Sequence, residues 1–228
     1  MNKLKRAFYQ KRIYNNKLLQ KITLISVKPI SLHDEFVDRK ICRMSIRKTV
    51  PTKCRESHGA TSSTATNYCV LKDVIDTSKL NEESKFIDVG CGKGRVLAYL
   101  LREKVDCKIV GVELDNEVAE IAKSWTKAYN NVEIINNNVF EMDMSEYTDF
   151  CLSRPFETDT FKEFLKKIER EAKQEVNVYL ISDQYLGDFL DERSGWTIEK
   201  RGIIYFRKGF YVYRTPQRYS VCKYNPNK

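Results

Sequence analysis

From residue 68 onward, the apolar positions of the chain switch repeatedly between two spacings. Short apolar runs typical of strands lie at 85–89, 108–113, 132–136, 148–152 and 176–182. Apolar residues at helical spacing predict helices over 68–78, 93–104, 115–128 and 158–172. Such strand–helix repetition predicts an α/β fold, a mostly parallel sheet with helices on both faces in a three-layer sandwich.

The C-terminal part follows another pattern. The runs 197–205 and 208–214 are both rich in β-forming residues and only a couple of residues separate them. That spacing favours a hairpin over a further strand–helix unit. The sheet should therefore end in an antiparallel C-terminal hairpin.

The N-terminal quarter differs from the rest in pattern and in charge. Residues 3–25 predict a helix that is basic on one side, whereas 26–58 looks irregular, with Pro29 and Pro51 as breaks. The small polar residues of 57–67 predict a flexible loop. We expect a basic, partly helical extension over 1–58 and one domain over 59–228.

The net charge of +9 is concentrated in that extension. Residues 1–58 hold 15 Lys and Arg against 4 Asp and Glu, a balance of +11, which leaves −2 for residues 59–228. A catalytic face that grips nucleic acid would usually carry such charge itself. Three roles stay open for the N-terminal helix: docking on its own domain, lying on anionic membrane through residues 1–25, or holding RNA phosphates.

Other features exclude some classes of protein. We find no apolar run of 18 residues and no secretory signal, so we expect a cytoplasmic protein without a transmembrane segment, with peripheral membrane contact as the alternative. The seven cysteines form no CxxC pair and only two histidines are present. We therefore expect no metal site, and thiols that are mostly small buried hydrophobes in a reducing compartment.

The stretch 86-FIDVGCGKGRVLAYL-100 places three glycines between a predicted strand and a predicted helix. Glycines there let the backbone approach a ligand closely, beside the free N–H groups of a helix start. The spacing is neither GxGxxG nor that of a P-loop. Asp88 would repel a pyrophosphate and attract an ammonium group. We expect Lys93 and Arg95 to point to solvent or to hold the helix start.

The Asp-x-Gly-x-Gly-x-Gly pattern from Asp88 to Gly94 resembles the first motif of the class I S-adenosylmethionine-dependent methyltransferases. That family has a seven-stranded Rossmann-like sheet whose last two strands form a hairpin. A subset of small bacterial members is similar in its Gly-Lys-Gly-Arg continuation. The resemblance covers about residues 66–214 and implies S-adenosylmethionine as cofactor, with S-adenosylhomocysteine as product.

The resemblance also implies which residues contact the cofactor. They are Asp88, Gly90, Gly92, Gly94, Glu113, Leu114, Asn138, Val139 and Ser153. Glu113 ends the second strand, where the family's acidic residue accepts bonds from the ribose hydroxyls; otherwise it is a helix-start carboxylate. Asp115 fits the N-cap of the next helix. Asn138 stands where the family usually has an aspartate that accepts the adenine amino group; otherwise it belongs to a polar turn.

Two further segments bear on the acceptor. Ser153-Arg154-Pro155-Phe156 follows the fourth strand, where amine methyltransferases of the family often carry [DNS]-P-P-[YFW]; Arg154 departs from that pattern. Thr66-Asn67-Tyr68 resembles a segment that could fold over the cofactor, or Thr66 or Asn67 could cap the following helix. Tyr68 and Asp183 are candidate bases, and Arg154 is a candidate anchor for an acidic substrate.

The resemblance implies direct methyl transfer, but it does not name the acceptor. Our first hypothesis is a small-molecule or glycan-type acceptor. The second is an RNA or protein acceptor gripped by the basic extension. The third is a non-catalytic scaffold domain that binds the cofactor without turnover.

Overall fold

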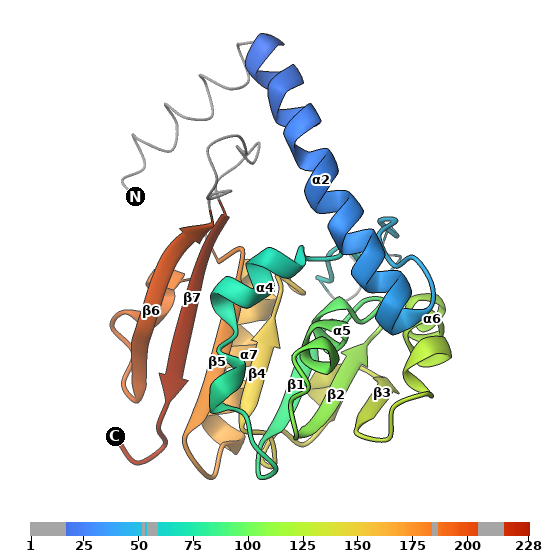
Figure 1. The fold of residues 1–228 in the computed structure, drawn as a ribbon. Coiled ribbons are helices and arrows are strands. Elements are labelled where there is room, and N and C mark those ends of the chain that lie inside the picture. The colour runs from blue at the N-terminus through green and yellow to red at the C-terminus, as the bar shows by residue number, and fades with distance from the viewer. Residues whose placement is uncertain (1–16, 52, 54–58, 184–186, 205–216) are drawn as a thin grey trace.

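A computed structural model describes residues 17–51, 53, 59–183, 187–204 and 217–228. Seven strands form one sheet in the order β3-β2-β1-β4-β5-β7-β6 (Figure 1). The strands are β1 (Lys85–Val89), β2 (Lys108–Glu113), β3 (Val132–Asn136), β4 (Asp149–Leu152), β5 (Val176–Ile181), β6 (Trp196–Ile204) and β7 (Gln217–Tyr224). Strands β1 to β5 are parallel, while β7 lies antiparallel between β5 and β6. The predicted α/β fold with a C-terminal antiparallel hairpin is confirmed.

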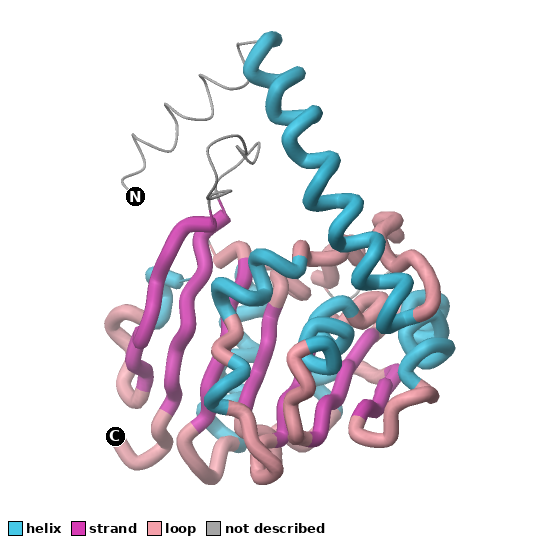
Figure 2. The backbone as a smooth tube through the Cα atoms, in the orientation of Figure 1, coloured by secondary structure: helices cyan, strands magenta, loops and turns pink. Residues whose placement is uncertain are grey.

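Helices cover both faces of this sheet (Figure 2). They are α2 (Lys17–Cys42), α4 (Tyr68–Val74), α5 (Arg95–Arg102), α6 (Asn116–Thr126) and α7 (Thr158–Glu171), with short 3-10 turns η1 (Thr77–Lys79), η2 (Val139–Glu141) and η3 (Gly187–Leu190). Successive residues of a strand point to opposite faces. Phe86 accordingly packs in the core under α2, α4, α5 and α6, whereas Ile87 packs in the core under α7.

Most predicted elements occur close to their predicted bounds. The strands β1, β2 and β3 begin and end where the apolar runs do, and Asp115 caps α6 by accepting from the N–H groups of Glu117 and Val118. Helix α4 is shorter than predicted because Ile75 is already extended. Helix α5 begins late because Gly94 before it is left-handed, with φ of 89°.

Two predictions about the chain ends need correction. Residues 26–42 are not irregular: α2 continues through them, with Pro29 inside the helix, because its second half packs on α5 and buries Val37 and Cys42. Of the helix predicted over 3–25, residues 17–25 are helical and the remainder lies outside the described residues. The predicted strand 208–214 also lies outside them, and the strand that pairs with β6 is β7.

Candidate functional site

The carboxyl ends of β1, β2 and β4 and the loops that follow them line a cavity of about 600 Å³. Ligands of open α/β sheets bind at this edge, where the chain reverses its winding between β1 and β4. Of the nine residues predicted to contact the cofactor, eight line this cavity. Gly94 is the exception, since it faces the Trp125 ring.

The glycine loop leaves β1 and crosses the floor of the cavity. Gly90 has a φ of 68°, and a Cβ there would lie 2.6 Å from the Pro155 Cβ. Gly92 has a φ of 56° and lies directly against the Ser63 hydroxyl. L-residues rarely adopt such backbone angles. The loop therefore needs glycine both for its conformation and for its close neighbours.

Two carboxylates meet beside this loop. Glu113 is pinned by backbone donors: its Oε2 accepts from the Gly92 N–H at 2.8 Å and its Oε1 from the Asp115 N–H at 2.9 Å. Burial raises the pKa of Glu113, and these two bonds oppose that effect. The acidic residue at the end of β2 thus fixes the shape of the glycine loop.

Asp88 is the less satisfied of the two carboxylates. Its side chain is 1% exposed, and its Oδ2 has no hydrogen-bond partner among the described residues. Burial, followed by repulsion from Glu113, raises the pKa of Asp88 well above its ordinary value. A buried, unpartnered carboxylate oxygen is costly unless a donor meets it. Its place in the cavity lining fits an ammonium group of a bound ligand.

The opposite end of the cavity follows β3. Asn138 is the N-cap of η2, where its Oδ1 accepts from the Phe140 N–H at 3.1 Å. Asn138 therefore caps a turn and also lines the cavity, so both interpretations of this residue stay open. Val139 and Phe140 line the cavity next to it, and Phe140 packs against Phe156 with ring centroids 5.7 Å apart. This end is largely apolar and suits a flat ring.

Residues 59–66, which we call the strap, close one side of the cavity. The strap is held to the loop after β4: the Thr61 N–H donates to the Pro155 carbonyl at 3.0 Å, and Thr61 Oγ1 donates to the Arg154 carbonyl at 2.6 Å. At its end, Thr66 Oγ1 lies 2.6 Å from Ser153 Oγ. The segment predicted as a flexible loop thus contacts the cavity directly. The cap interpretation is not supported: Asn67 occupies the N-cap position of α4, yet its side chain makes no cap bond.

The three candidate catalytic residues do not line the cavity. Tyr68 is fully buried, and its hydroxyl donates to Asp38 Oδ1 at 2.8 Å; burial raises its pKa. Asp183 accepts from Arg218 Nε at 2.9 Å and from the Ser220 hydroxyl. Arg154 is exposed on the loop after β4, with a φ of 52°. The structure does not bring these three residues together.

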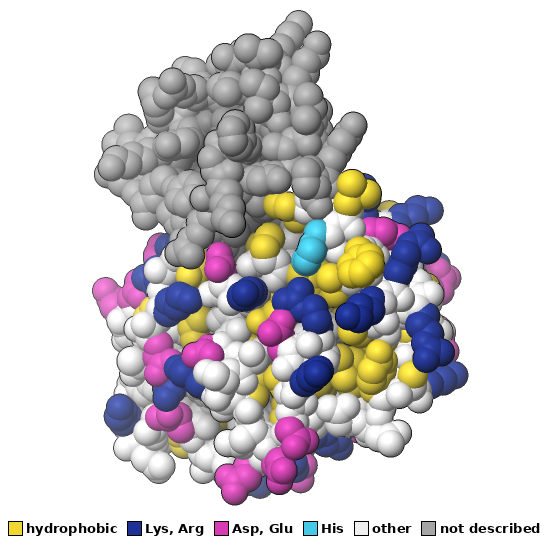
Figure 3. Space-filling view, in the orientation of Figure 1, with side chains coloured by type: hydrophobic (Ala, Val, Ile, Leu, Met, Phe, Trp, Pro, Cys, Tyr) yellow, Lys and Arg dark blue, Asp and Glu magenta, His cyan; other side chains and the backbone are white. Residues whose placement is uncertain are grey.

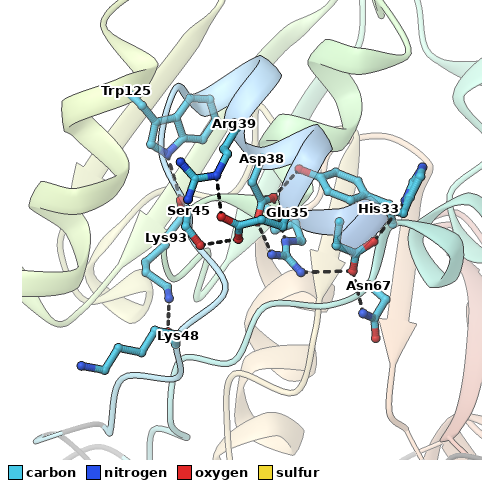
Figure 4. Close-up of polar contacts among 12 residues, drawn as sticks. His33, Glu35, Asp38, Arg39, Ser45, Lys48, Asn67, Lys93 and Trp125 are labelled. Carbon is cyan, nitrogen blue, oxygen red and sulfur yellow. Dashed lines mark hydrogen bonds and ion pairs between the residues drawn. The ribbon is translucent and has the colours of Figure 1, made fainter. Parts of the chain in front are cut away.

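The prediction that Lys93 and Arg95 point to solvent is wrong. Both are buried: Lys93 Nζ donates to the Lys48 carbonyl, and the Arg95 guanidinium pairs with Asp34 and Asp38 of α2 (Figure 4). Asp38 also accepts from Tyr68, and Asp34 accepts from Asn67 Nδ2 at 2.6 Å. This network joins α2 to the helix that follows the glycine loop. The only sequence signal for it was the pair of acids one helical turn apart.

The described residues give no sign of a metal site or a membrane span. Among them, no group of three or more His, Cys, Asp or Glu could hold a metal ion. Six of the seven cysteines are described, none in a disulfide, and all but Cys69 are buried. Of the helices in this part of the chain, none has the length and apolar character that a membrane crossing requires.

Comparison with known proteins supports the interpretation of the glycine loop as part of a methyltransferase domain. A family model described as a methyltransferase domain matches residues 86–175. A protein-lysine N-methyltransferase of Saccharolobus islandicus is 30% identical over 110 residues, which cover 46% of this chain and 65% of that protein. A ribosomal RNA small subunit methyltransferase A of Caldanaerobacter subterraneus is 36% identical over 77 residues, 34% of this chain and 28% of that protein. The chain thus spans less than two thirds of these relatives.

Solved structures agree at the level of the fold. The crystal structure of an RNA methyltransferase from Salinibacter ruber, in complex with S-adenosyl-L-homocysteine, aligns with a TM-score of 0.51 at 15% identity. The alignment covers 71% of this chain and 93% of that one. The family match agrees with what the structure shows of the chain, namely the strand order, the glycine loop and the acid at the end of β2. Residues 86–175 thus match a methyltransferase domain, within a fold shared with methyltransferases of solved structure.

Proposed function

We propose that the chain is an active methyltransferase that binds S-adenosylmethionine in the cavity at the carboxyl ends of β1, β2 and β4. The observation that carries this proposal is the unpartnered Oδ2 of Asp88, buried in the lining of that cavity. A carboxylate oxygen held there without a donor suits the amino group of the cofactor. The backbone of the glycine loop passes directly beside it.

The remaining lining residues fit the other parts of the cofactor. Glu113 keeps acceptor capacity on both carboxylate oxygens and can take bonds from the two ribose hydroxyls. Leu114, Val139 and Phe140 form the apolar end of the cavity and would enclose the adenine ring, with Asn138 at its edge. The bound cofactor supplies an activated methyl group. Ser153 and the strap border the cavity on another side, where they exclude water.

The chain's own contribution to methyl transfer is then alignment and the exclusion of water. A strongly basic side chain is needed only where the acceptor arrives protonated. Tyr68 and Asp183 hold structural bonds away from the cavity, which leaves them poorly suited to that task. A nucleophile that is already neutral at its attacking atom fits this site best.

The acceptor is the open part of the proposal. Our first hypothesis, a small molecule or glycan, finds no counterpart among the relatives described above, which are named for ribosomal RNA and for protein lysine. We therefore propose a macromolecular acceptor, either RNA or protein. A scaffold that binds the cofactor without turnover is the remaining alternative.

Calorimetry with S-adenosylmethionine and S-adenosylhomocysteine tests the cofactor site. Wild type should bind both, and Glu113→Ala should weaken binding roughly tenfold or more, because hydrogen bonds to a charged group contribute about 1.5–3 kcal/mol. Glu133→Ala is the matched control, since Glu133 is an exposed glutamate on the neighbouring strand β3. A wild-type chain that binds neither compound, or binds NAD instead, refutes the proposal. Binding without methyl transfer to any RNA or protein supports the scaffold.

A further inference from the structure

Six exposed cations lie on the last turn of α2 and on the segment after it. They are Arg39, Lys40, Arg43, Arg47, Lys48 and Lys53, which we call the basic strip. In the sequence, these residues belong to the basic extension and stand far from the glycine loop. Their position in the fold decides whether this charge can act at the cavity.

The contacts of the segment place the basic strip at the cavity rim. Val50 and Ser63 exchange two backbone hydrogen bonds of 3.0 Å, and Ser63 is part of the strap. The Lys48 carbonyl accepts from Lys93, another lining residue. Lys53 Nζ lies 2.5 Å from Glu117 in the first turn of α6, just beyond Glu113 and Leu114. The strip therefore runs alongside the cavity and does not hang away from it.

The acids near the basic strip do not neutralise it. Asp34 and Asp38 are buried and committed to Arg95. At the surface, Glu35 pairs with Arg39 and Glu117 with Lys53. This leaves Lys40, Arg43, Arg47 and Lys48 without an ion pair to any described residue. In Figure 3, basic side chains lie around the foot of α2, and basic and acidic ones are interspersed over the rest of this face.

We propose that the basic strip binds the phosphate backbone of an RNA acceptor and so brings a nucleotide to the cavity. This inference rests on the proposed function, because it names the acceptor of the same site. A row of exposed cations neutralises phosphates and gives affinity without sequence preference. The same row would repel the cationic surroundings of a lysine acceptor. The charge that the sequence assigns to the N-terminal quarter thus lies on the catalytic side of the fold.

Binding of a fluorescent single-stranded RNA of about 20 nucleotides to the full chain tests the inference. The strip variant is Lys40→Gln/Arg43→Gln/Arg47→Gln, which spares the Lys48 carbonyl. The matched control is Lys79→Gln/Lys85→Gln/Lys108→Gln, three cations in η1 and at the amino ends of β1 and β2. Anisotropy is recorded from about 50 to about 200 mM KCl, the range in which counterion release is steep.

Each phosphate contact on a single strand contributes about 0.7 to the slope of log affinity against log salt. Three lost contacts should lower that slope by about 2, so wild type should lose about 20-fold more affinity than the strip variant across this range. The control variant should keep the wild-type slope. All three proteins should bind S-adenosylhomocysteine equally, because none of the changed side chains lines the cavity.

Two results would overturn the inference while the cofactor proposal stands. One is that wild type and strip variant both bind S-adenosylhomocysteine and show the same slope of log RNA affinity against log salt. The other is label from tritiated S-adenosylmethionine that enters protease-sensitive and not ribonuclease-sensitive material. A wild-type chain that does not bind S-adenosylhomocysteine would instead refute the proposed function.

Discussion

Replacing Asp88 by asparagine separates the proposed cofactor role of this residue from its place in the fold. The side chain is 1% exposed and its Oδ2 has no partner among the described residues. An asparagine has almost the same shape and carries no charge. The ligand-free chain should therefore become more stable, while the complex with the cofactor should become weaker.

The magnitudes follow from the buried carboxylate. Leaving a buried polar atom unsatisfied costs about 1–3 kcal/mol, and part of that cost disappears with the charge. We expect Asp88→Asn to raise the free energy of unfolding by roughly 1 kcal/mol at neutral pH. A bond between a carboxylate and an ammonium group contributes about 1.5–3 kcal/mol, so S-adenosylhomocysteine should bind about 10- to 150-fold more weakly.

The dependence on pH gives a second readout. Burial raises the folded-state pKa of Asp88 above the unfolded value of about 3.9. Between these two values the folded chain binds more protons than the unfolded chain, so rising pH lowers the wild-type free energy of unfolding. The stabilisation by Asp88→Asn should grow with pH across this window and then level off. A bound ammonium favours the ionised carboxylate, so wild-type affinity should rise with pH and variant affinity should not.

Asp149→Asn is the matched control. Asp149 is also a buried aspartate, 2% exposed, whose pKa is raised by burial, but it starts β4 at the opposite edge of the sheet. Its carboxylate accepts from Thr148, Asn177 and Tyr179. This change should destabilise the fold and leave cofactor affinity unaltered. Equal affinity of Asp88→Asn and wild type for S-adenosylhomocysteine would refute the assignment of Asp88 to the amino group.

Two further predictions concern the groups around the glycine loop. Arg95→Met should cost about 3–5 kcal/mol of unfolding free energy in urea titrations, because it leaves Asp34 and Asp38 buried without their cation; a loss below about 1 kcal/mol would contradict a buried network. Gly92→Ala should speed the release of S-adenosylhomocysteine in stopped-flow experiments, since a methyl group there meets the Ser63 hydroxyl and displaces the strap. Adding Ser63→Ala should restore part of the slow release, and no restoration would mean that backbone strain alone is responsible.

The parallel sheet was predictable because its signals are local. Each central strand is a short apolar run between turn residues, and burial on both faces requires such a run. The glycine loop could be found for a similar reason, since its spacing reflects a backbone shape that few residue types other than glycine allow. The acid at the end of β2 was predicted from the resemblance to the methyltransferase motif. Eight of the nine predicted cofactor contacts consequently line one cavity.

The errors arise where a long-range contact overrides a local signal. Pro29 indicates a helix break, yet α2 passes through it because Asp34 and Asp38 find Arg95 about 60 residues further on. Basic residues after a glycine loop usually suggest solvent or a ligand phosphate. Here Lys93 and Arg95 turn toward α2 and the segment after it, which no pattern within the loop itself indicates.

The N-terminal segment serves the cavity in two ways. One side of α2 supplies the carboxylates that hold Arg95 next to the glycine loop, and the residues after α2 supply the basic strip and the Lys48 carbonyl that holds Lys93. Deleting residues 1–58 would therefore leave Arg95 and Lys93 buried in the cavity lining without their hydrogen-bond and ion-pair partners. Such a truncation should lose cofactor binding and RNA binding together. Point changes such as those in the strip variant remove charge but leave the partners of Arg95 and Lys93 in place. Only such changes can show that RNA binds to the basic strip.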